Sequence, residues 1–347
     1  MYLNYRVINI VYNLKEKIKV VHYGIGPIGL SIAELVSKKK GIESVGAIDL
    51  DPQKVGKDLG EIIKLKQDTG IIISDNSELK LKETKPDIVI HTTSSSLIKV
   101  LPQLEEIAKS GANIISTCEE LSFPWRKNKE VASKIDRIAK DNNITILGTG
   151  VNPGFVLDSL VLALSGACQE IKSIKGIRVV DASTRRLPLQ KKIGAGMDVK
   201  EFEELMKKED IGHVGLTESV EIIAYGLGIE LEEVKQQIKP KIAESELETK
   251  YFKIQAGKVC GIEQEAIGIV NGKRFIELKL EMFIGATNPS DKIIIEGNPK
   301  LETIINNGTA GDIATAAIIV NSISNVIKAR PGVTIVNEIP MPSAIIE

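Results

Sequence analysis

Two kinds of apolar pattern alternate along the first 150 residues of the chain. Continuous β-branched and apolar runs predict strands at 18–23, 44–50, 87–92, 112–117 and 144–147, and the segments between them carry apolar residues at helical spacing. Because the runs do not alternate with polar residues, we expect strands buried on both faces beneath helices. Such strands pair in parallel through right-handed crossovers. The pattern therefore predicts an α/β fold with a doubly wound parallel sheet.

The pattern changes after the last of these strands. The segment GTGVNPGF is a loop rich in Gly, Pro and Asn, and longer strands, acidic helical segments and hairpin-like pieces follow it. In IVNGKRFIEL, Asn271-Gly272 favours a tight hairpin turn. A long helix of small and apolar residues is expected at 308–329, ahead of the stop signal Pro331-Gly332. We interpret this part as a second domain of α+β type.

Composition excludes several classes of protein. Of 347 residues, 43% are hydrophobic and 26% charged, an ordinary globular balance. The 45 Lys and Arg against 46 Asp and Glu leave a formal net charge of -1, so the chain lacks the positive field that draws proteins to nucleic acid. No apolar run reaches the length of about 18 residues that a membrane-spanning helix needs. We expect neither nucleic acid nor a membrane as a partner.

The cysteines and histidines are too scattered to form a disulfide framework or a metal site. They are Cys118, Cys168, Cys260, His22, His91 and His213. We expect no bound metal, and three separated cysteines suit a reducing cytoplasm. A homodimer is the assembly we expect, because symmetric dimers are the commonest soluble oligomers.

The segment GIGPIG follows the first strand and opens the first helix. Gly24 permits a tight turn, Gly26 lets the backbone approach a pyrophosphate, and Gly29 lets the helix lie close to the strand. The pyrophosphate would lie at the helix N-terminus, against Gly26, Pro27 and Ile28. Glycine-rich turns also occur in α/β proteins that bind no nucleotide, but the strand and helix on either side favour a dinucleotide site of Rossmann type.

Asp49 ends the second strand, 49 − 29 = 20 residues beyond Gly29. Its carboxylate would accept hydrogen bonds from the adenosine ribose and repel a 2′-phosphate, which favours NAD over NADP. Lys54 could accommodate a phosphate, so both NAD and NADP stay open as cofactors. Asp51, between them, is more typical of a turn residue.

These features divide the chain into four expected parts. They are an N-terminal extension at 1–17, a dinucleotide-binding domain at 18–150, a substrate-binding and oligomerisation domain at 151–304, and a C-terminal helix and tail at 305–347 that return to the first domain.

Polar side chains follow two of the strands of the first sheet. Thr92, Thr93 and Ser94 lie past a strand end and could line the nicotinamide side, although hydroxyls in this run could instead cap the next helix. Asn152 could bind the nicotinamide carboxamide through its amide group. The alternative is an Asn-Pro turn with no ligand.

Four further segments carry a family likeness. They are IISTCEELSFPW at 114–125, GTGVNPGFVLDSL at 148–160, VVDASTRRLPLQKKIGAG at 179–196 and ARPGVTIVNEIP at 329–340. From about residue 18 onwards the chain resembles the 2,4-diaminopentanoate dehydrogenases, a group that includes native amine dehydrogenases and is related to dihydrodipicolinate reductase. The resemblance implies NAD(P)-dependent oxidative deamination at a carbon that does not bear the carboxylate. The reverse reaction would be reductive amination of a ketone or keto acid.

One feature of the related reductases is missing. Dihydrodipicolinate reductases carry paired histidines with a catalytic lysine, and this chain has no adjacent histidines. This argues against a reductase of the lysine pathway. An imine or aldehyde reductase that uses no free ammonia remains the alternative, because a fold hosts many chemistries.

Amine oxidation needs a base for each proton transfer, and a carboxylate also stabilises the cationic iminium. Glu119 and Glu120 follow the strand at 112–117, at the rim where the nicotinamide should lie. The resemblance points to a glutamate in this segment. We favour Glu120 over Glu119, and the other glutamate would then be a surface or helix-start acid.

The expected partners are a small amine or ketone substrate and ammonia. Arg178, Arg185 and Arg186 could clamp a substrate carboxylate in bidentate fashion, although most arginines are merely solvated. Asp181 could hold the second ammonium group of a diamino acid.

Overall fold

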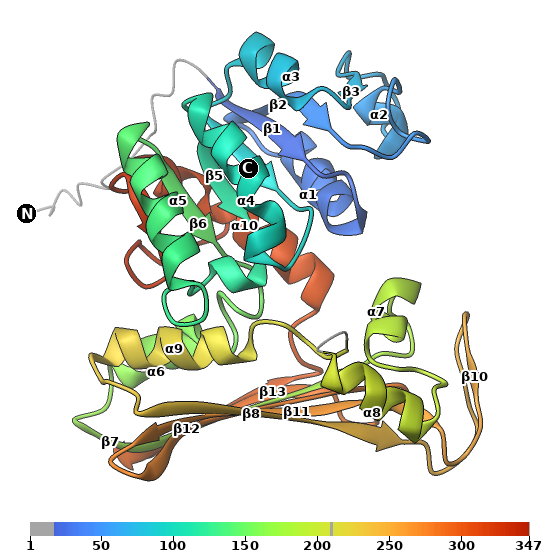
Figure 1. The fold of residues 1–347 in the computed structure, drawn as a ribbon, viewed down its shortest axis with the longest axis vertical. Coiled ribbons are helices and arrows are strands. Elements are labelled where there is room, and N and C mark those ends of the chain that lie inside the picture. Colours follow the sequence, from blue (N-terminus) through green and yellow to red (C-terminus); the bar gives the residue numbers. More distant parts are fainter. Residues whose placement is uncertain (1–16, 209–210, 347) are drawn as a thin grey trace, which may run out of the picture.

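The structure is a computed structural model that describes residues 17–208 and 211–346. A seven-stranded sheet with helices on both faces lies beside a six-stranded sheet with helices on one face (Figure 1). The expected N-terminal extension lies outside the described residues except for Lys17. No helix in the described part of the chain is both long and apolar enough to cross a membrane.

The first sheet is parallel throughout and runs in the order β15-β6-β5-β4-β1-β2-β3. Its strands are β1 (Ile18–Tyr23), β2 (Ile42–Ile48), β3 (Ile73–Ser74), β4 (Ile88–His91), β5 (Asn113–Ser116), β6 (Thr145–Gly148) and β15 (Gly332–Thr334). Apart from β15, this is the strand order of dinucleotide-binding folds, with the switch point between β1 and β4. The Rossmann-type sheet expected from the sequence is confirmed.

Helices cover both faces of the first sheet. They are α1 (Pro27–Ser37), α2 (Leu59–Ile62), α3 (Ser77–Thr84), α4 (Leu97–Lys109), α5 (Lys129–Asp141) and α10 (Gly311–Lys328), with a short 3₁₀ helix η1 (Glu119–Leu121). Along β1, Val20 packs beneath α1 and α10, whereas Val21 packs beneath α3, α4 and α5. Successive residues of a strand point to opposite faces, so these continuously apolar strands build two cores.

The second sheet is mixed and runs in the order β14-β13-β7-β12-β11-β8. Its strands are β7 (Glu170–Asp181), β8 (Glu233–Ile242), β11 (Val259–Val270), β12 (Lys273–Phe283), β13 (Ser290–Asn298) and β14 (Leu301–Asn306). The pair β9 (Leu247–Glu248) and β10 (Lys253–Ile254) stands apart. The Asn271-Gly272 turn between β11 and β12 is confirmed, with φ of 50° and 68°, as a tight two-residue hairpin requires.

The helices of the second body all lie on the side of its sheet that faces the first body (Figure 1). They are α6 (Ser159–Ser165), α7 (Leu187–Lys192), α8 (Val199–Lys207) and α9 (Leu216–Leu227). Phe202 of α8 and Val220 of α9 are fully buried against this sheet. The opposite face carries the charged side chains of the alternating strands.

The last helix, α10, ties the two bodies together. Its first turn lies near the second sheet, and its later turns pack Ile319, Val320 and Ile323 against the first sheet. The chain then enters β15, which pairs with β6 at the edge of that sheet. The space between the two sheets is therefore closed at one side by α10.

Candidate active site

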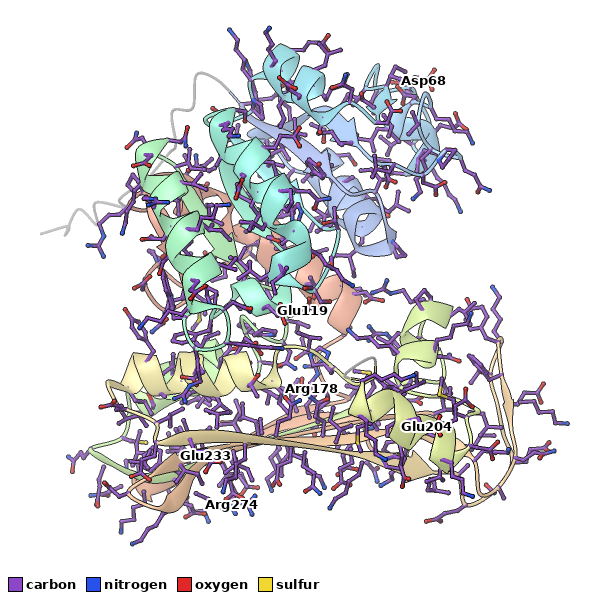
Figure 2. The ribbon with its side chains drawn as sticks, viewed as in Figure 1. Asp68, Glu119, Arg178, Glu204, Glu233 and Arg274 are labelled. Carbon is purple, nitrogen blue, oxygen red and sulfur yellow. The ribbon has the colours of Figure 1, made fainter. Side chains whose placement is uncertain are left out.

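A cavity of about 420 Å³ lies between the two bodies. Figure 2 shows Glu119 on the first body and Arg178 on the second, on opposite sides of this space. Eleven of the site residues expected from the sequence line it: Gly26, Pro27, Ile28, Thr92, Thr93, Ser94, Glu119, Asn152, Arg178, Arg185 and Arg186. The cavity wall does not include Gly24, Gly29, Asp49, Glu120 or Asp181.

The glycine turn has the shape of a phosphate cradle. Gly24 has a φ of +97°, and a Cβ there would lie 2.9 Å from the Thr92 carbonyl oxygen. A Cβ on Gly29 would collide with the Gly24 carbonyl, whereas nothing lies within 4 Å of the Cβ position at Gly26. Gly26 is the N-cap of α1, and because glycine has no side chain, no capping hydrogen bond satisfies the first N–H groups of the helix. The open N-terminus of α1 therefore suits an anionic group.

Asp49 connects the glycine turn to the end of β2. Its carboxylate accepts the Ile25 N–H at 2.7 Å and the Asp51 N–H at 2.8 Å. Lys54 Nζ lies 3.5 Å from Asp49 and 3.1 Å from Asp51. The neighbouring Leu50 is 74% exposed, an apolar surface beside the carboxylate. A ribose hydroxyl would meet both an acceptor and a cation here.

The hydroxyls past β4 are already engaged. The Thr92 hydroxyl donates to the Gly24 carbonyl at 2.7 Å, so Thr92 holds the glycine turn as well as lining the cavity. The Thr93 hydroxyl donates to Gln103 Oε1 at 2.7 Å and lies 2.9 Å from Nε2 of the buried His91. Burial lowers the pKa of His91 to about 4, which keeps its ring neutral at pH 7. These contacts shape the wall of the cavity.

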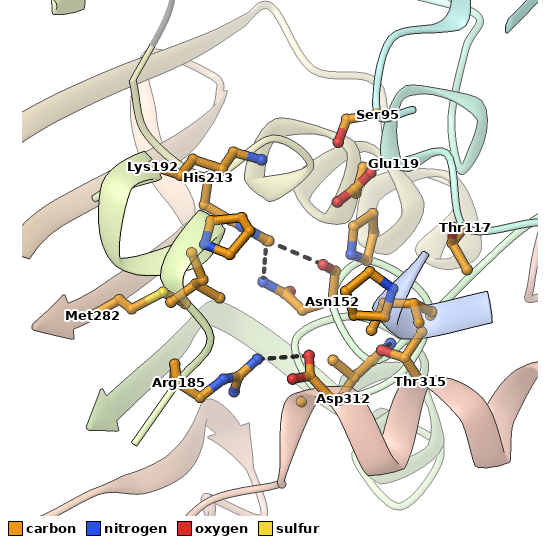
Figure 3. A pocket seen from close by; sticks show the side chains of 18 of the residues that line it. Ser95, Thr117, Glu119, Asn152, Arg185, Lys192, His213, Met282, Asp312 and Thr315 are labelled. Carbon is orange, nitrogen blue, oxygen red and sulfur yellow. Dashed lines mark hydrogen bonds and ion pairs between the residues drawn. The ribbon is translucent and has the colours of Figure 1, made fainter. Parts of the chain in front are cut away.

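The two adjacent glutamates point to different sides of η1. Glu120 accepts the Leu97 N–H at the start of α4 at 2.8 Å and pairs with Lys127 at 3.1 Å. Glu119 lines the cavity instead, beside Ser95 (Figure 3). This arrangement favours Glu119 as the reactive carboxylate, the reverse of the order expected from the sequence. The reason is that consecutive residues of a 3₁₀ turn project about 120° apart.

The environment of Glu119 makes its carboxylate a stronger base. Burial raises its pKa above the ordinary value of 4.5, and the nearby Lys192 ammonium and Ser95 hydroxyl oppose that rise. Glu120 adds a smaller upward effect. A carboxylate whose pKa is raised by burial holds a proton closer to neutral pH, as a general base requires.

Asn152 lies in the loop after β6, which lines the cavity. Its Nδ2 lies 3.2 Å from His213 Nε2, and its buried Oδ1 has no partner among the described residues. Burial lowers the pKa of His213 to about 3, so this ring is neutral. Asp158 holds the loop by accepting the Gly154 N–H at 2.8 Å. An amide oxygen fixed in this way can accept a hydrogen bond from a ligand.

Other buried polar atoms on the cavity wall also lack hydrogen-bond partners within the part of the chain that the structure describes. They are Ser122 Oγ, Thr149 Oγ1, Arg185 Nε and Arg186 Nε. Buried polar groups are nearly always hydrogen-bonded in native proteins. The cavity is therefore built for a polar ligand, and the residues present fit the nicotinamide end of a dinucleotide.

Two arginines on the cavity wall already make hydrogen bonds within the protein. Arg178 is 3% exposed, and its two terminal nitrogens contact Asp291 at 3.1 Å and the Thr309 carbonyl at 2.6 Å. Arg185 donates to Asp312 at 2.8 Å. Arg178 therefore holds the segment that leads into α10. Because both of its terminal nitrogens are already bonded, few of its N–H groups remain for a substrate carboxylate.

Arg186 and Asp181 complete the expected set. Arg186 Nε lies 3.7 Å from Asp312, so the carboxylate at the start of α10 serves two arginines. Asp181 accepts from the N–H and hydroxyl of Ser183, at 3.0 and 2.6 Å, and lies off the cavity wall. This placement offers no support for a role in holding a substrate ammonium.

Several polar residues of the wall were not expected from the sequence to belong to the site, among them Ser95, Lys192, His213 and Asp312. Lys192 lies within the 179–196 segment that carries the family likeness, which was the one signal available for it. His213 and Asp312 reach the cavity only through the packing of the second body. Among residues 17–208 and 211–346, no cluster of His, Cys, Asp or Glu is arranged to hold a metal ion.

Known protein families match both bodies. Residues 155–347 match the 2,4-diaminopentanoate dehydrogenase C-terminal domain, and residues 18–122 match the dihydrodipicolinate reductase N-terminus. A 2,4-diaminopentanoate dehydrogenase of Acetoanaerobium sticklandii is 32% identical over 341 residues, 95% of each chain. An amine dehydrogenase of Streptomyces virginiae is 25% identical over 353 residues, covering 94% of this chain and 98% of that one.

Solved structures share the fold. An amine dehydrogenase from Mycobacterium smegmatis superposes with a TM-score of 0.86 at 24% identity, covering 94% of this chain and 97% of that one. A dipicolinate-bound dihydrodipicolinate reductase from Paenisporosarcina superposes more loosely, with a TM-score of 0.51 at 12% identity and coverage of 93% and 98%. The arrangement of both bodies is therefore shared with these enzymes.

Proposed function

The chain belongs to the 2,4-diaminopentanoate dehydrogenase family and is an NAD(P)-dependent oxidoreductase, and we propose that it oxidises an amine to a ketone and ammonia with Glu119 as the base. The observation that carries this proposal is the position of Glu119. It is a carboxylate of raised pKa on the wall of the same cavity that Gly26 of the glycine cradle lines. Of the carboxylates that line the cavity, Asp312 is already paired with arginine.

The cofactor would lie along the carboxyl edge of the first sheet. Gly26 and the first turn of α1 would hold the pyrophosphate, and Asp49 would hold the adenosine ribose. The unpartnered Asn152 Oδ1 would accept the carboxamide N–H of the nicotinamide. When bound, the nicotinamide ring supplies the acceptor for the hydride.

Glu119 would act at three points in the reaction. Its carboxylate takes a proton from the substrate ammonium, so that the neutral amine can lose hydride from its carbon. That proton then passes to solvent, and the ionised carboxylate stabilises the resulting iminium by its charge and takes a proton from the water that adds to the iminium carbon. The same group returns this second proton to nitrogen, and as ammonia leaves it takes the proton of the carbinolamine hydroxyl, which gives the ketone. The reverse sequence is reductive amination.

Both nicotinamide cofactors fit the environment of Asp49. The carboxylate favours ribose hydroxyls, whereas Lys54 is close enough to pair with a 2′-phosphate. We propose that the enzyme uses NAD and NADP, with Asp49 setting the preference for NAD. The ratio of kcat/KM for the two cofactors measures this directly.

The uncovered face of the second sheet supports a homodimer. Charges of both signs interleave on it, as in the pairs Lys175–Glu277 and Lys279–Glu263, so the face can complement a second copy of itself. Sedimentation at micromolar concentration would give a monomer if this proposal is wrong.

The three thiols are unpaired, which suits a reducing cytoplasm.

The decisive experiment is a substrate panel in both directions. We expect NAD(P)H formation from 2,4-diaminopentanoate or a related amine, with one ammonia released per turnover. In reverse, oxidation of NAD(P)H by the ketone should require ammonium. Ammonium-independent reduction of an imine or aldehyde, with no amine oxidised, would favour the reductase alternative instead.

A further inference from the structure

Lys192, the last residue of α7, reaches into the cavity from a rigid backbone. Figure 3 shows its side chain extending toward Glu119 and Ser95. The helix is pinned by the fully buried Gln190, whose Nε2 donates to the carbonyls of Ala182 at 2.9 Å and Arg185 at 2.8 Å. The position of the backbone that carries Lys192 is therefore built into the fold.

Gln190 is itself held from the other side. Its Oε1 accepts the Thr249 hydroxyl at 2.9 Å, and the Lys192 carbonyl accepts the Gly212 N–H at 3.2 Å. The segment that carries Lys192 is thus fixed to Thr249, just after β9, on one side and to the loop that contains Gly212 and His213 on the other. The backbone that presents the Lys192 side chain to the cavity is therefore held in place before a ligand binds.

The other cations of the cavity have carboxylate partners. Arg178 pairs with Asp291, and Arg185 and Arg186 share Asp312. Within the described part of the chain, no carboxylate oxygen lies within ion-pair distance of Lys192. The neighbouring His213 is neutral, so it neither repels nor replaces an anion at this position.

Resting on the proposed function, we propose that Lys192 binds a carboxylate of the substrate and thereby makes the enzyme selective for amino acids over simple amines. The charges of the cavity match such a substrate. Glu119 attracts the ammonium that reacts, and Lys192 attracts the carboxylate. A charge-assisted hydrogen bond in a partly buried site contributes both affinity and orientation.

The test compares two substrates that share the reacting group. These are 2,4-diaminopentanoate and pentan-2-amine, which lacks both the carboxylate and the amino group beside it. In Lys192→Met, the kcat/KM ratio of diaminopentanoate to pentan-2-amine should fall about 10- to 100-fold, the range for loss of a charged hydrogen bond. Lys192→Arg, which keeps the charge, should retain most of the ratio. Lys191→Met removes an exposed lysine one residue away and should leave the ratio unchanged.

The ratio separates this inference from its rivals. Because Lys192 also acts on the pKa of Glu119, its loss can change both rates, but such an effect cancels in the ratio. An unchanged ratio in Lys192→Met overturns the inference while the amine dehydrogenase function stands. A wild-type enzyme that oxidises neither amine overturns the proposed function itself.

A measurement on the wild-type enzyme does not depend on folding of a variant. Pentanoate carries the carboxylate but no amine, so it should inhibit oxidation of pentan-2-amine competitively. In Lys192→Met, its inhibition constant should rise about 10- to 100-fold. Absence of inhibition in the wild type contradicts carboxylate binding at this position.

Discussion

Replacing each of the two adjacent glutamates separates catalysis from stability. Glu119→Gln keeps the shape of the side chain but removes proton acceptance, so kcat should fall about 10²- to 10⁴-fold. Cofactor affinity should change little, because the glycine cradle and Asp49 are untouched. The acid limb of the wild-type kcat/KM profile should lie above pH 4.5 and disappear in this variant, since burial raises the pKa of Glu119.

Glu120→Gln is the matched control. Glutamine can still accept the Leu97 N–H, and the lost pair involves Lys127, whose side chain is 60% exposed. Exposed ion pairs contribute about 0–1 kcal/mol, so the free energy of unfolding should fall by about 1 kcal/mol or less. Its kcat should stay within a few-fold of the wild type.

Steady-state kinetics across pH 5–9 give kcat and the pH profile of kcat/KM for the wild type, Glu119→Gln and Glu120→Gln. Urea denaturation of the same three proteins gives their free energies of unfolding. A large loss of kcat in Glu120→Gln with full activity in Glu119→Gln would refute the reasoning. It would mean that η1 turns the other carboxylate toward the substrate when ligands bind.

Three further predictions follow from the cofactor cradle and the buried rings. Asp49→Ala should lower the NAD-to-NADP ratio of kcat/KM and Lys54→Met should raise it; two unchanged ratios would assign the preference elsewhere. Gly26→Ala should fold normally but weaken NADH binding about 10- to 100-fold in calorimetry, whereas Gly29→Ala should fail to fold stably because its methyl group meets the Gly24 carbonyl. Burial holds the pKa of the three histidines at about 3 to 4, so the folded state binds fewer protons than the unfolded chain below pH 6.5. The histidines should therefore lower the unfolding free energy by about 1.4 kcal/mol per histidine and pH unit as the pH drops from 6.5 toward 4. Buried carboxylates of raised pKa, such as Glu119, offset part of this fall, and a higher stability at pH 5 than at pH 7 in urea titrations would contradict a dominant histidine effect.

The first sheet could be predicted because local signals and tertiary packing agree there. The run at 18–23 is β1 itself, and the glycine turn adopts the positive φ that its spacing implies. β15 was missed, because three residues after Pro331 carry no periodic pattern and become a strand only by pairing with β6.

The site was less predictable because it depends on which way each side chain points and on partners that are far away in the sequence. Sequence places Glu119 and Glu120 at one strand end, but only the turn decides which carboxylate faces the cavity. Arg178 was assigned to a substrate, yet its partner Asp291 lies 113 residues away and engages it within the protein. Lys192 was not considered, since its function depends on a cavity formed by two bodies.

The pinning of α7 by Gln190 has a consequence for directed evolution. The cofactor half of the cavity comes from the first sheet, whereas Leu189, Lys192 and Ile193 face it from a short helix anchored by one buried amide. A combinatorial library that varies these three positions and retains Gln190 changes the shape and charge around the substrate without altering the dinucleotide cradle. New amine preferences can therefore be sought in a single six-residue segment and its immediate neighbour.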